Sequence, residues 1–368
     1  MSLATYDEAR PWAKAIKEEV LERRMPPWRA ARGYGEFRNA MVLPQHDIDL
    51  LVNWVEGGAP KGDDKDLPSG PLFSTDWQMG KPDLILKPES ESKVAGDADE
   101  YRDFLLPTNL KEARWLTAVD LRPGAASVVH CATLYLVKAE TTAEAPPAML
   151  QVKSDDSVAS SSAAFQNAAV LGTWMPGQKT IALGGGVAQA LPAGSRLGVR
   201  IHYRGSAEEN KDLSSVGLYF AKALPKKQLQ ELAITNREAL IPMGAELQHI
   251  NLSLTTLSDS EAVAIRPNVH PLLVSLQATA YRPDGSQEVL IWARGYQSDW
   301  APTYYFKQPV ALPRGTRVEV IAYFDNSEDN QNNRHPAKSV RWSELRPTPL
   351  CVLLVANPAS VSGQPGAR

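Results

Sequence analysis

Residues 128–137 read Val128-Val129-His130-Cys131-Ala132-Thr133-Leu134-Tyr135-Leu136-Val137, and they decide the fold. β-Branched and aromatic residues dominate the stretch, as is typical of strands that pack on a core. A turn signal, Pro123-Gly124, stands shortly before it. The pattern therefore predicts a buried β-strand.

Two side chains that can bind a metal, His130 and Cys131, stand next to each other at the start of this predicted strand. A second predicted strand, residues 197–203, carries another single imidazole, His202, near its end. Two strands that each bring a histidine into one sandwich could form half of a metal site, because imidazole is a common ligand for copper and zinc. For the two strands alone, the simpler interpretation is a pair of hydrogen-bonded core histidines.

The composition is that of a globular protein. The 368 residues suffice for two or three domains, and 43% of them are hydrophobic. The net charge is -3 without a Lys/Arg cluster, so nucleic acid is not an expected partner. We expect no transmembrane segment and no signal peptide, because no apolar run is long enough and the N-terminus is amphipathic.

Cysteine is rare in this chain. Cys131 and Cys351 are the two cysteines of the sequence. They exclude a disulfide framework, a Cys-x-x-Cys zinc site and a Cys-x-x-Cys-His haem attachment within these residues.

Helical periodicity is confined to the N-terminal region. Apolar residues recur at helical spacing in residues 6–24 and 45–56. A Thr5-x-x-Glu8 pattern predicts a capping box at the first helix, and Gly57-Gly58 is a stop signal for the second. Two such short helices need a partner or a cofactor to fold.

The remaining chain follows a linker at residues 63–70 and has the short alternating runs of β-strands. Strands are predicted at residues 84–86, 114–121, 128–137, 196–203, 215–221, 249–254, 272–281, 288–293, 317–324 and 351–355. Their number suits two antiparallel, jelly-roll-like β-sandwiches better than one. A basic segment at residues 222–232 should join them, with a helix at residues 226–232. The predicted domains are residues 1–68, 69–225 and 226–356, and residues 357–368 form a flexible tail.

The helical region contains three recognisable motifs: Ser2-Leu3-Ala4-Thr5-Tyr6, Met25-Pro26-Pro27-Trp28 and Trp54-Val55-Glu56-Gly57-Gly58-Ala59-Pro60-Lys61-Gly62-Asp63. Together they resemble the distal half of a bacterial c-type cytochrome domain. In that family the methionine of the Met-Pro-Pro-Trp loop is an axial haem ligand, a role that the resemblance carries over to Met25; the alternative is a core methionine. The proximal half is absent, so we expect the chain to begin inside a domain. Haem c is expected only if a Cys-x-x-Cys-His precedes Met1.

The β-rich region carries five further motifs: Trp77-Gln78-Met79-Gly80-Lys81-Pro82-Asp83, Tyr101-Arg102-x-Phe104, Trp174-Met175-Pro176-Gly177, Pro283-Asp284-Gly285 and Tyr323-Phe324-Asp325-Asn326-Ser327-x-x-Asn330. They resemble the copper type II, ascorbate-dependent monooxygenases, whose members include peptidylglycine α-hydroxylating monooxygenase. The last motif is similar to a bacterial branch in which a cytochrome domain precedes two β-sandwiches. The resemblance implies a mainly β fold, a periplasmic or secreted location, a small-molecule or peptide substrate and a redox partner.

The first copper centre of that family uses an adjacent His-His pair and a later histidine. The matching residues are His130, Cys131 and His202. Adjacent residues on a regular strand point to opposite faces, so His130 and Cys131 can share a metal only near a bulge or a strand end. If Cys131 is a ligand, its soft thiolate favours Cu(I).

The second copper centre of the family, where oxygen is activated, uses His-x-His and a distant methionine. The resemblance places Asn268, His270 and Leu350 at these positions. An amide coordinates copper poorly and leucine has no lone pair, so one ligand of three is left. Cys351 beside Leu350 reads as a buried structural thiol.

Three other histidines, His46, His249 and His335, are expected to be exposed or to cap turns. The resulting hypothesis is a pseudoenzyme: a monooxygenase fold that has lost its oxygen-activating copper and acts as a binding or electron-transfer component with zero or one copper. The alternative is an active copper monooxygenase that hydroxylates a C–H bond with O2 and electrons from a haem domain.

Overall fold

The computed structural model describes residues 3, 5–67, 77–96, 98–138, 149–150, 165, 168–235, 238–268, 270–295, 302–333, 338–342 and 349–359. These residues are mainly β, with a helical N-terminal region, which confirms the predicted fold class. The chain forms two compact units. Residues Met1–Arg29 and Ala40–Ser74 make the first, and Ala30–Asn39 with Thr75–Arg368 make the second.

The first unit contains the helices. They are α1 (Tyr6–Ala9), the 3-10 turn η1 (Arg10–Trp12), α2 (Ala13–Leu21), α3 (Gln45–Glu56) and the 3-10 turn η2 (Asp64–Asp66). The Thr5–Glu8 capping box is confirmed. The helix predicted from residue 6 to residue 24 is interrupted at η1, which contains Pro11, because proline supplies no N–H to an α-helical ladder. The second helix has its predicted bounds. None of the helices within the described ranges is long and apolar enough to cross a membrane.

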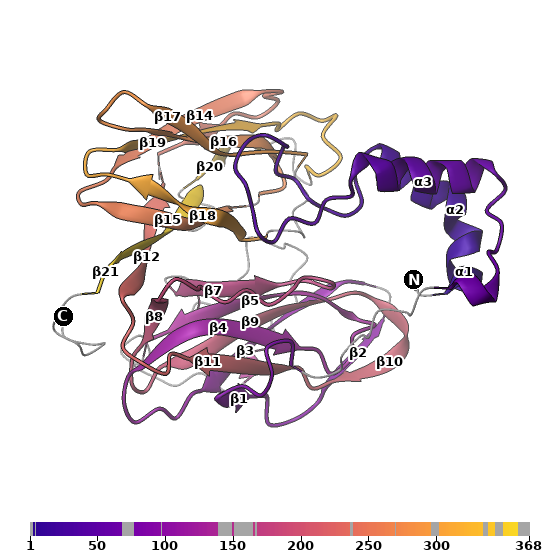
Figure 1. Cartoon of the computed structure of the whole chain (residues 1–368), viewed down its shortest axis with the longest axis horizontal. Coiled ribbons are helices and arrows are strands. Elements are labelled where there is room, and N and C mark those ends of the chain that lie inside the picture. The colour runs from indigo at the N-terminus through magenta and orange to yellow at the C-terminus, as the bar shows by residue number, and fades with distance from the viewer. Residues whose placement is uncertain are drawn as a thin grey trace. The chain divides into compact units, whose positions relative to one another are not determined.

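The first sandwich of the second unit pairs two sheets (Figure 1). One has the strand order β6 (Met149–Leu150), β3 (Glu100–Pro107), β9 (Arg196–Tyr203), β5 (Val129–Val137) and β7 (Ala169–Trp174). The other contains β1 (Leu84–Leu86), β11 (Ser215–Phe220), β4 (Arg114–Arg122) and β8 (Val187–Leu191). A separate pair is formed by β10 (Ser206–Asp212) and β2 (Ser92–Gly96).

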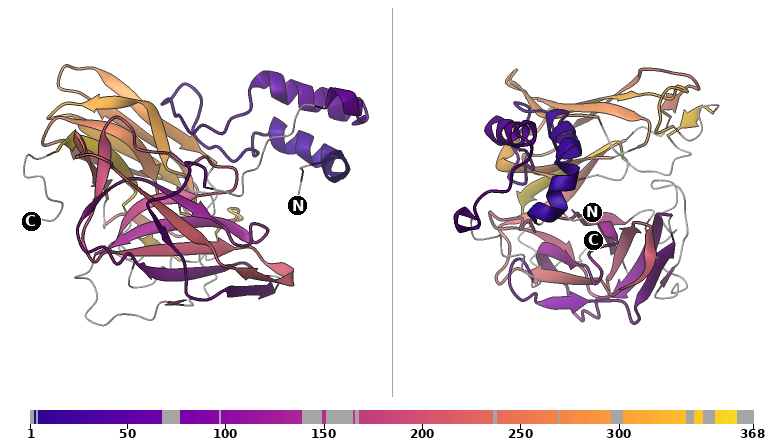
Figure 2. Two further views of the ribbon diagram at one scale, coloured as in Figure 1. Left: turned by 60° about the horizontal axis from the view of Figure 1, so that its bottom comes forward. Right: turned by 90° about the vertical axis from the view of Figure 1, so that its right-hand side faces the viewer.

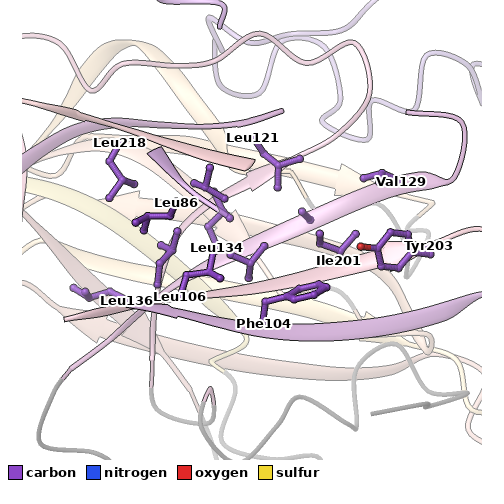
Figure 3. Close-up of a cluster of buried hydrophobic side chains, with 14 of the residues drawn as sticks. Leu86, Phe104, Leu106, Leu121, Val129, Leu134, Leu136, Ile201, Tyr203 and Leu218 are labelled. Carbon is purple, nitrogen blue, oxygen red and sulfur yellow. The ribbon is translucent and has the colours of Figure 1, made fainter. Parts of the chain in front are cut away.

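Alternation along the strands builds the core of this sandwich. In β5, Ala132, Leu134 and Leu136 are buried, whereas the residues between them are partly exposed. Figure 3 shows Phe104, Leu134 and Ile201 among the buried side chains that fill the space between the sheets. The stretch that decides the fold is thus an inner strand of its sheet, between β9 and β7.

The second sandwich repeats this arrangement (Figure 2). Its outer sheet has the order β14 (Gln248–Thr255), β19 (Arg317–Phe324), β16 (Leu273–Tyr281) and β17 (Gln287–Arg294). The facing strands are β12 (Lys227–Ile234), β21 (Cys351–Pro358), β15 (Ser260–Pro267) and β18 (Tyr304–Leu312). A short pair, β13 (Leu240–Ile241) and β20 (Val340–Arg341), lies beside them. Each strand predicted from the sequence corresponds to an observed strand, with bounds that differ by a few residues at most.

One eight-stranded sheet runs through both sandwiches, in the order β1-β11-β4-β8-β12-β21-β15-β18. The connection is a short parallel pairing of Lys227 with Val187 and Gln228 with Ala188. The helix predicted at residues 226–232 is therefore wrong. These residues are good helix formers, but pairing of β12 with β21 along its whole length overrides that preference. The same ladder includes Asn357 and Pro358, so the prediction of a flexible tail is wrong for these two residues, and residues 360–368 lie outside the described part of the chain.

The segment Ala30–Asn39 extends along the second sandwich. Ala30 and Phe37 form isolated bridges to Ala293 and Phe306. The Arg38 N–H donates to the Tyr305 carbonyl at 2.9 Å. The sequence prediction assigned these residues to the range 1–68, because nothing in their composition indicates a β partner so far along the chain.

Candidate functional site

A β-bulge lies in β5 at the position of the predicted metal ligands. Val129 pairs with Tyr203 and Cys131 pairs with His202 on β9. His130 is therefore the extra residue of the bulge and is not paired in this ladder. The bulge re-aims the side chains on either side of it. As a result both His130 and Cys131 approach His202: the two imidazole rings lie 5.0 Å apart, and Cys131 Sγ lies 4.0 Å from His202 Nδ1.

His202 is the centre of this cluster and is held on three sides. Its Nε2 lies 3.0 Å from Asp99 Oδ2, and its ring stacks on that of Tyr101 with centroids 4.3 Å apart. Asp99 is itself fixed, because its other oxygen accepts the Gly205 N–H at 3.0 Å. When the Nε2 proton is donated to Asp99, Nδ1 presents its lone pair to the Cys131 sulfur.

The Cys131–His202 pair fits a single metal ion. Bonds of about 2.0 Å to nitrogen and about 2.3 Å to sulfur add up to about 4.3 Å, which exceeds the observed separation. One ion can therefore reach both atoms at a wide angle, a geometry that suits Cu(I). A carboxylate behind the ligating imidazole is the usual means of orienting it.

His130 fits a metal less well. It is buried, and its Nε2 faces the Arg204 guanidinium at 3.5 Å. A guanidinium has only donors and a fixed positive charge, so it competes with a cation for this nitrogen. In the described part of the chain, no three His, Cys, Asp or Glu side chains come together as a metal site. The cluster thus provides two donors, from Cys131 and His202.

The structure also brings together the positions of the second predicted centre. The Asn268 N–H donates to the Leu350 carbonyl at 2.9 Å, and Cys351 pairs with Pro267 in the adjoining ladder. His270 follows closely in the chain and its Nδ1 accepts the Leu272 N–H at 3.1 Å. Because that bond occupies the Nδ1 lone pair, the neutral ring carries its proton on Nε2 and offers no free nitrogen. These residues do not fit copper.

Cys351 does not offer a reactive thiol. It is fully buried, and burial raises the pKa of its thiol from its ordinary value of 9.0 to about 12. A thiol in such surroundings stays protonated and inert at neutral pH.

The remaining predicted residues lie apart from these clusters. Met25 is half exposed and its N–H donates to the Glu19 carbonyl at 3.2 Å. The two cysteines of the chain lie outside the first unit, so a thioether-linked haem does not fit the residues present. His46 is exposed on α3, His249 lies in β14 with its ring 6.2 Å from that of Tyr323, and His335 lies outside the described residues.

Sequence reasoning missed the residues that support His202. Asp99 and Arg204 carry no motif, and Asp99 is more than one hundred positions from its partner. Tyr101 belongs to a quoted motif, but only the register of β3 against β9, which places Tyr101 opposite His202, reveals its role. A prediction of that strand pairing could have found it.

The chain was compared with known proteins. No protein-family model and no curated protein matches it. Solved structures with a weak likeness include the infectious bursal disease virus VP2 subviral particle, at 10% identity over 80% of each chain with a TM-score of 0.19. Others are an allantoicase (9% identity, 61% of this chain and 78% of that chain, TM-score 0.17) and the tandem CBM22 domain of Paenibacillus barcinonensis Xyn10C (10%, 76% and 98%, 0.15). Likeness at this level carries no argument about fold or function.

Proposed function

We propose that this chain is a copper-binding electron-transfer component built on the copper type II monooxygenase fold. It would bind one Cu(I) ion between Cys131 and His202 and would not hydroxylate a substrate. The family resemblance of the sequence supports the scaffold, and with it a periplasmic or secreted location. The arrangement of the cluster supports the choice of metal and stoichiometry.

The observation that carries the proposal is the alignment Asp99–His202–Cys131. Asp99 orients the imidazole through Nε2, and the 4.0 Å between Nδ1 and the sulfur leaves room for one ion. Thiolate is a soft ligand and selects Cu(I) over harder divalent ions. Tyr101 restricts rotation of the ring from one face.

Bound copper would supply one-electron redox chemistry. The protein's part is to hold the ion and to expose it. His202 is buried, but the Asp99 side chain behind it is about half exposed, with 54% of its surface accessible. A redox partner could therefore approach within two side chains of the ion. Arg204 would keep a positive charge beside the centre and favour the reduced, less positive metal.

Loss of hydroxylation is inferred from the second cluster. Oxygen activation in this family needs a copper ion with several strong donors, and Asn268, His270 and Leu350 supply at most one. The alternative is an active monooxygenase with unusual ligands. It is supported by the backbone hydrogen bond from Asn268 to Leu350, which brings together two positions that the resemblance assigns to the second copper centre.

Anaerobic titration with Cu(I) against a chromophoric competitor tests the proposal. The native chain should bind one equivalent, and Cys131→Ser should lower the affinity by roughly a hundredfold. His46→Ala, on an exposed face of α3, is the matched control and should leave binding unchanged. Two equivalents together with O2 consumption in the presence of a reductant would support the monooxygenase instead, and no binding would overturn both.

A further inference from the structure

The strand β14 is the last strand of the four-stranded sheet in the second sandwich. It pairs with β19 along its whole length without a register shift, and within the described part of the chain no strand pairs with its other edge. Two other sheet edges of this sandwich are covered, because Ala30 bridges to Ala293 in β17 and Phe37 bridges to Phe306 in β18. β14 therefore presents a row of backbone groups that another strand can pair with.

Every second residue of β14 directs its backbone groups away from β19. Just beyond the strand, the Thr256 N–H donates to the Thr316 carbonyl at 2.9 Å and so faces the neighbouring chain segment. Because backbone groups alternate along an antiparallel strand, the odd-numbered residues from 249 to 255 face the open edge. In agreement, the His249 carbonyl accepts the side-chain amide of Gln248 at 3.1 Å. The odd-numbered residues thus offer their N–H and C=O groups to a new partner.

The sequence around β14 has none of the usual protection of an edge strand. Residues 247–257 contain no charged residue, no proline and no glycine. Edge strands commonly carry a charge, a proline or a bulge that prevents pairing with another chain. Leucines stand exposed just before and just after the strand, Leu247 with 66% and Leu257 with 88% of its surface accessible. A regular, uncharged edge between two exposed leucines is suited to pairing with another strand.

We propose that β14 pairs antiparallel with β14 of a second copy of this chain, with the two copies of Leu252 opposite each other. In this register odd-numbered residues face odd-numbered residues, so the open backbone groups of both strands meet, and Asn251 lies opposite Ser253. Leu247 of one copy comes beside Leu257 of the other at both ends of the pairing. A shift by two residues would separate these leucines. The strand is complementary to itself, and without charges it does not repel its own copy.

The same pairing covers apolar surface at the edge of the core. Ile250 is buried on the inner face of β14, whereas Leu252 and Leu254 on that face are only partly buried. In the proposed register the two copies of Leu252 contact each other, and Leu254 contacts Ile250 of the second copy. Cross-strand pairs of this kind stabilise a sheet. One sheet would then be continuous across the two copies.

Sedimentation velocity of the full chain tests the proposal, in reducing, metal-free buffer at about 1 to 100 µM protein. We expect a reversible dimer. Asn251→Lys with Ser253→Lys places lysines opposite each other twice, and should weaken the dimer by roughly tenfold or more. Asn251→Glu with Ser253→Lys is the matched control, because it places opposite charges at the same positions and should keep the dimer. Both variants put the same lysine beside Glu319 of β19, and both changed residues are exposed.

Disulfide cross-linking tests the register. Leu252→Cys should join two copies on oxidation with diamide, since opposed residues of a non-hydrogen-bonded pair have Cα atoms about 4.5 Å apart. Leu254→Cys is the matched control on the same face of the strand. Its two copies would lie about 13 Å apart along the strands and should not cross-link. Peptide mapping without reduction identifies the linked residues.

The exposed leucines provide a third measurement. Leu257→Ser should weaken the dimer by roughly fivefold, because the leucine loses its apolar neighbour in the second copy. Leu224→Ser, which changes a leucine that is 72% exposed before β12, should leave the dimer unchanged.

Four results would overturn the proposal. They are a native chain that stays monomeric over the whole concentration range, a dimer that the two lysines do not weaken, equal weakening by both charge variants, and cross-linking of Leu254→Cys as fast as that of Leu252→Cys. If a cysteine variant does not fold, the two charge variants still decide, because their positions lie outside the core.

Discussion

His202 lies in β9 beside Cys131, and His270 follows β15, whose last residue, Pro267, pairs with Cys351. The Nε2 of His202 lies beside a carboxylate, and its Nδ1 faces the Cys131 sulfur. His270 uses Nδ1 to accept a backbone N–H, and Cys351 nearby is fully buried. Under the proposed function this difference decides which histidine can bind copper, because His202 has Nδ1 beside a sulfur atom whereas the Nδ1 of His270 is engaged by the backbone.

The largest expected effect concerns the two thiols. In metal-free protein at pH 8, iodoacetamide should modify Cys131 roughly a thousandfold faster than Cys351, because Cys351 becomes reachable only through unfolding that costs about 5 kcal/mol or more. Time-resolved mass spectrometry after digestion measures both rates. Similar rates would show that the second site is as open as the first and would remove the contrast between them.

The carboxylate behind His202 should matter next. Asp99→Asn keeps the size of the side chain but removes its charge, and should lower Cu(I) affinity by about 10–100-fold. Glu208→Gln, an exposed carboxylate in β10, serves as the control in the same competitive titration. An unchanged affinity for Asp99→Asn would mean that His202 is not oriented through Nε2.

A third prediction uses the burial of Cys351. Its folded-state pKa of about 12 lies above the ordinary 9.0, so the unfolded chain loses this proton first as pH rises. The stabilising contribution is complete below pH 9 and is lost progressively between pH 9 and pH 12. At pH 10 the loss should be about 1.4 kcal/mol. Urea unfolding at pH 8 and pH 10 measures it, and the difference should shrink in Cys351→Ala; an equal slope in both proteins would contradict the assignment.

Rebuilding the closed site should have the smallest effect. Asn268→His together with Leu350→Met restores two donors beside His270, and copper retained after desalting should rise a few-fold above the native level. The gain is limited because His270 Nδ1 already accepts the Leu272 N–H. The single variants are the controls. Unchanged copper content would count against the positions that the family resemblance gives to residues 268 and 350.

Local patterns in the sequence were enough to predict much of the fold. Strands such as β5 and β9 alternate apolar residues over a core, and that alternation is visible in one dimension. β12 was assigned the wrong structure because its Lys, Gln, Leu and Glu residues favour a helix, and only pairing with β21 makes it a strand. Local preference thus failed where long-range pairing decides.

Only some residues of the candidate site could be predicted from the sequence. His130, Cys131 and His202 stand out by residue type, and the need for a bulge follows from strand geometry alone. Asp99 and Arg204 do not stand out, because each gains its role from a partner more than seventy positions away. Such partners become evident only when strand register is known.

The parallel pairing of β8 with β12 also determines how the protein could be divided. β8 and β12 form hydrogen bonds with each other along part of their length. Neither sandwich therefore ends in a fully exposed strand edge at this point. A cut in the loop between β11 and β12 would leave both strands with unsatisfied N–H and C=O groups. Isolated halves would then tend to self-associate through these edges, and the natural unit for expression is the pair.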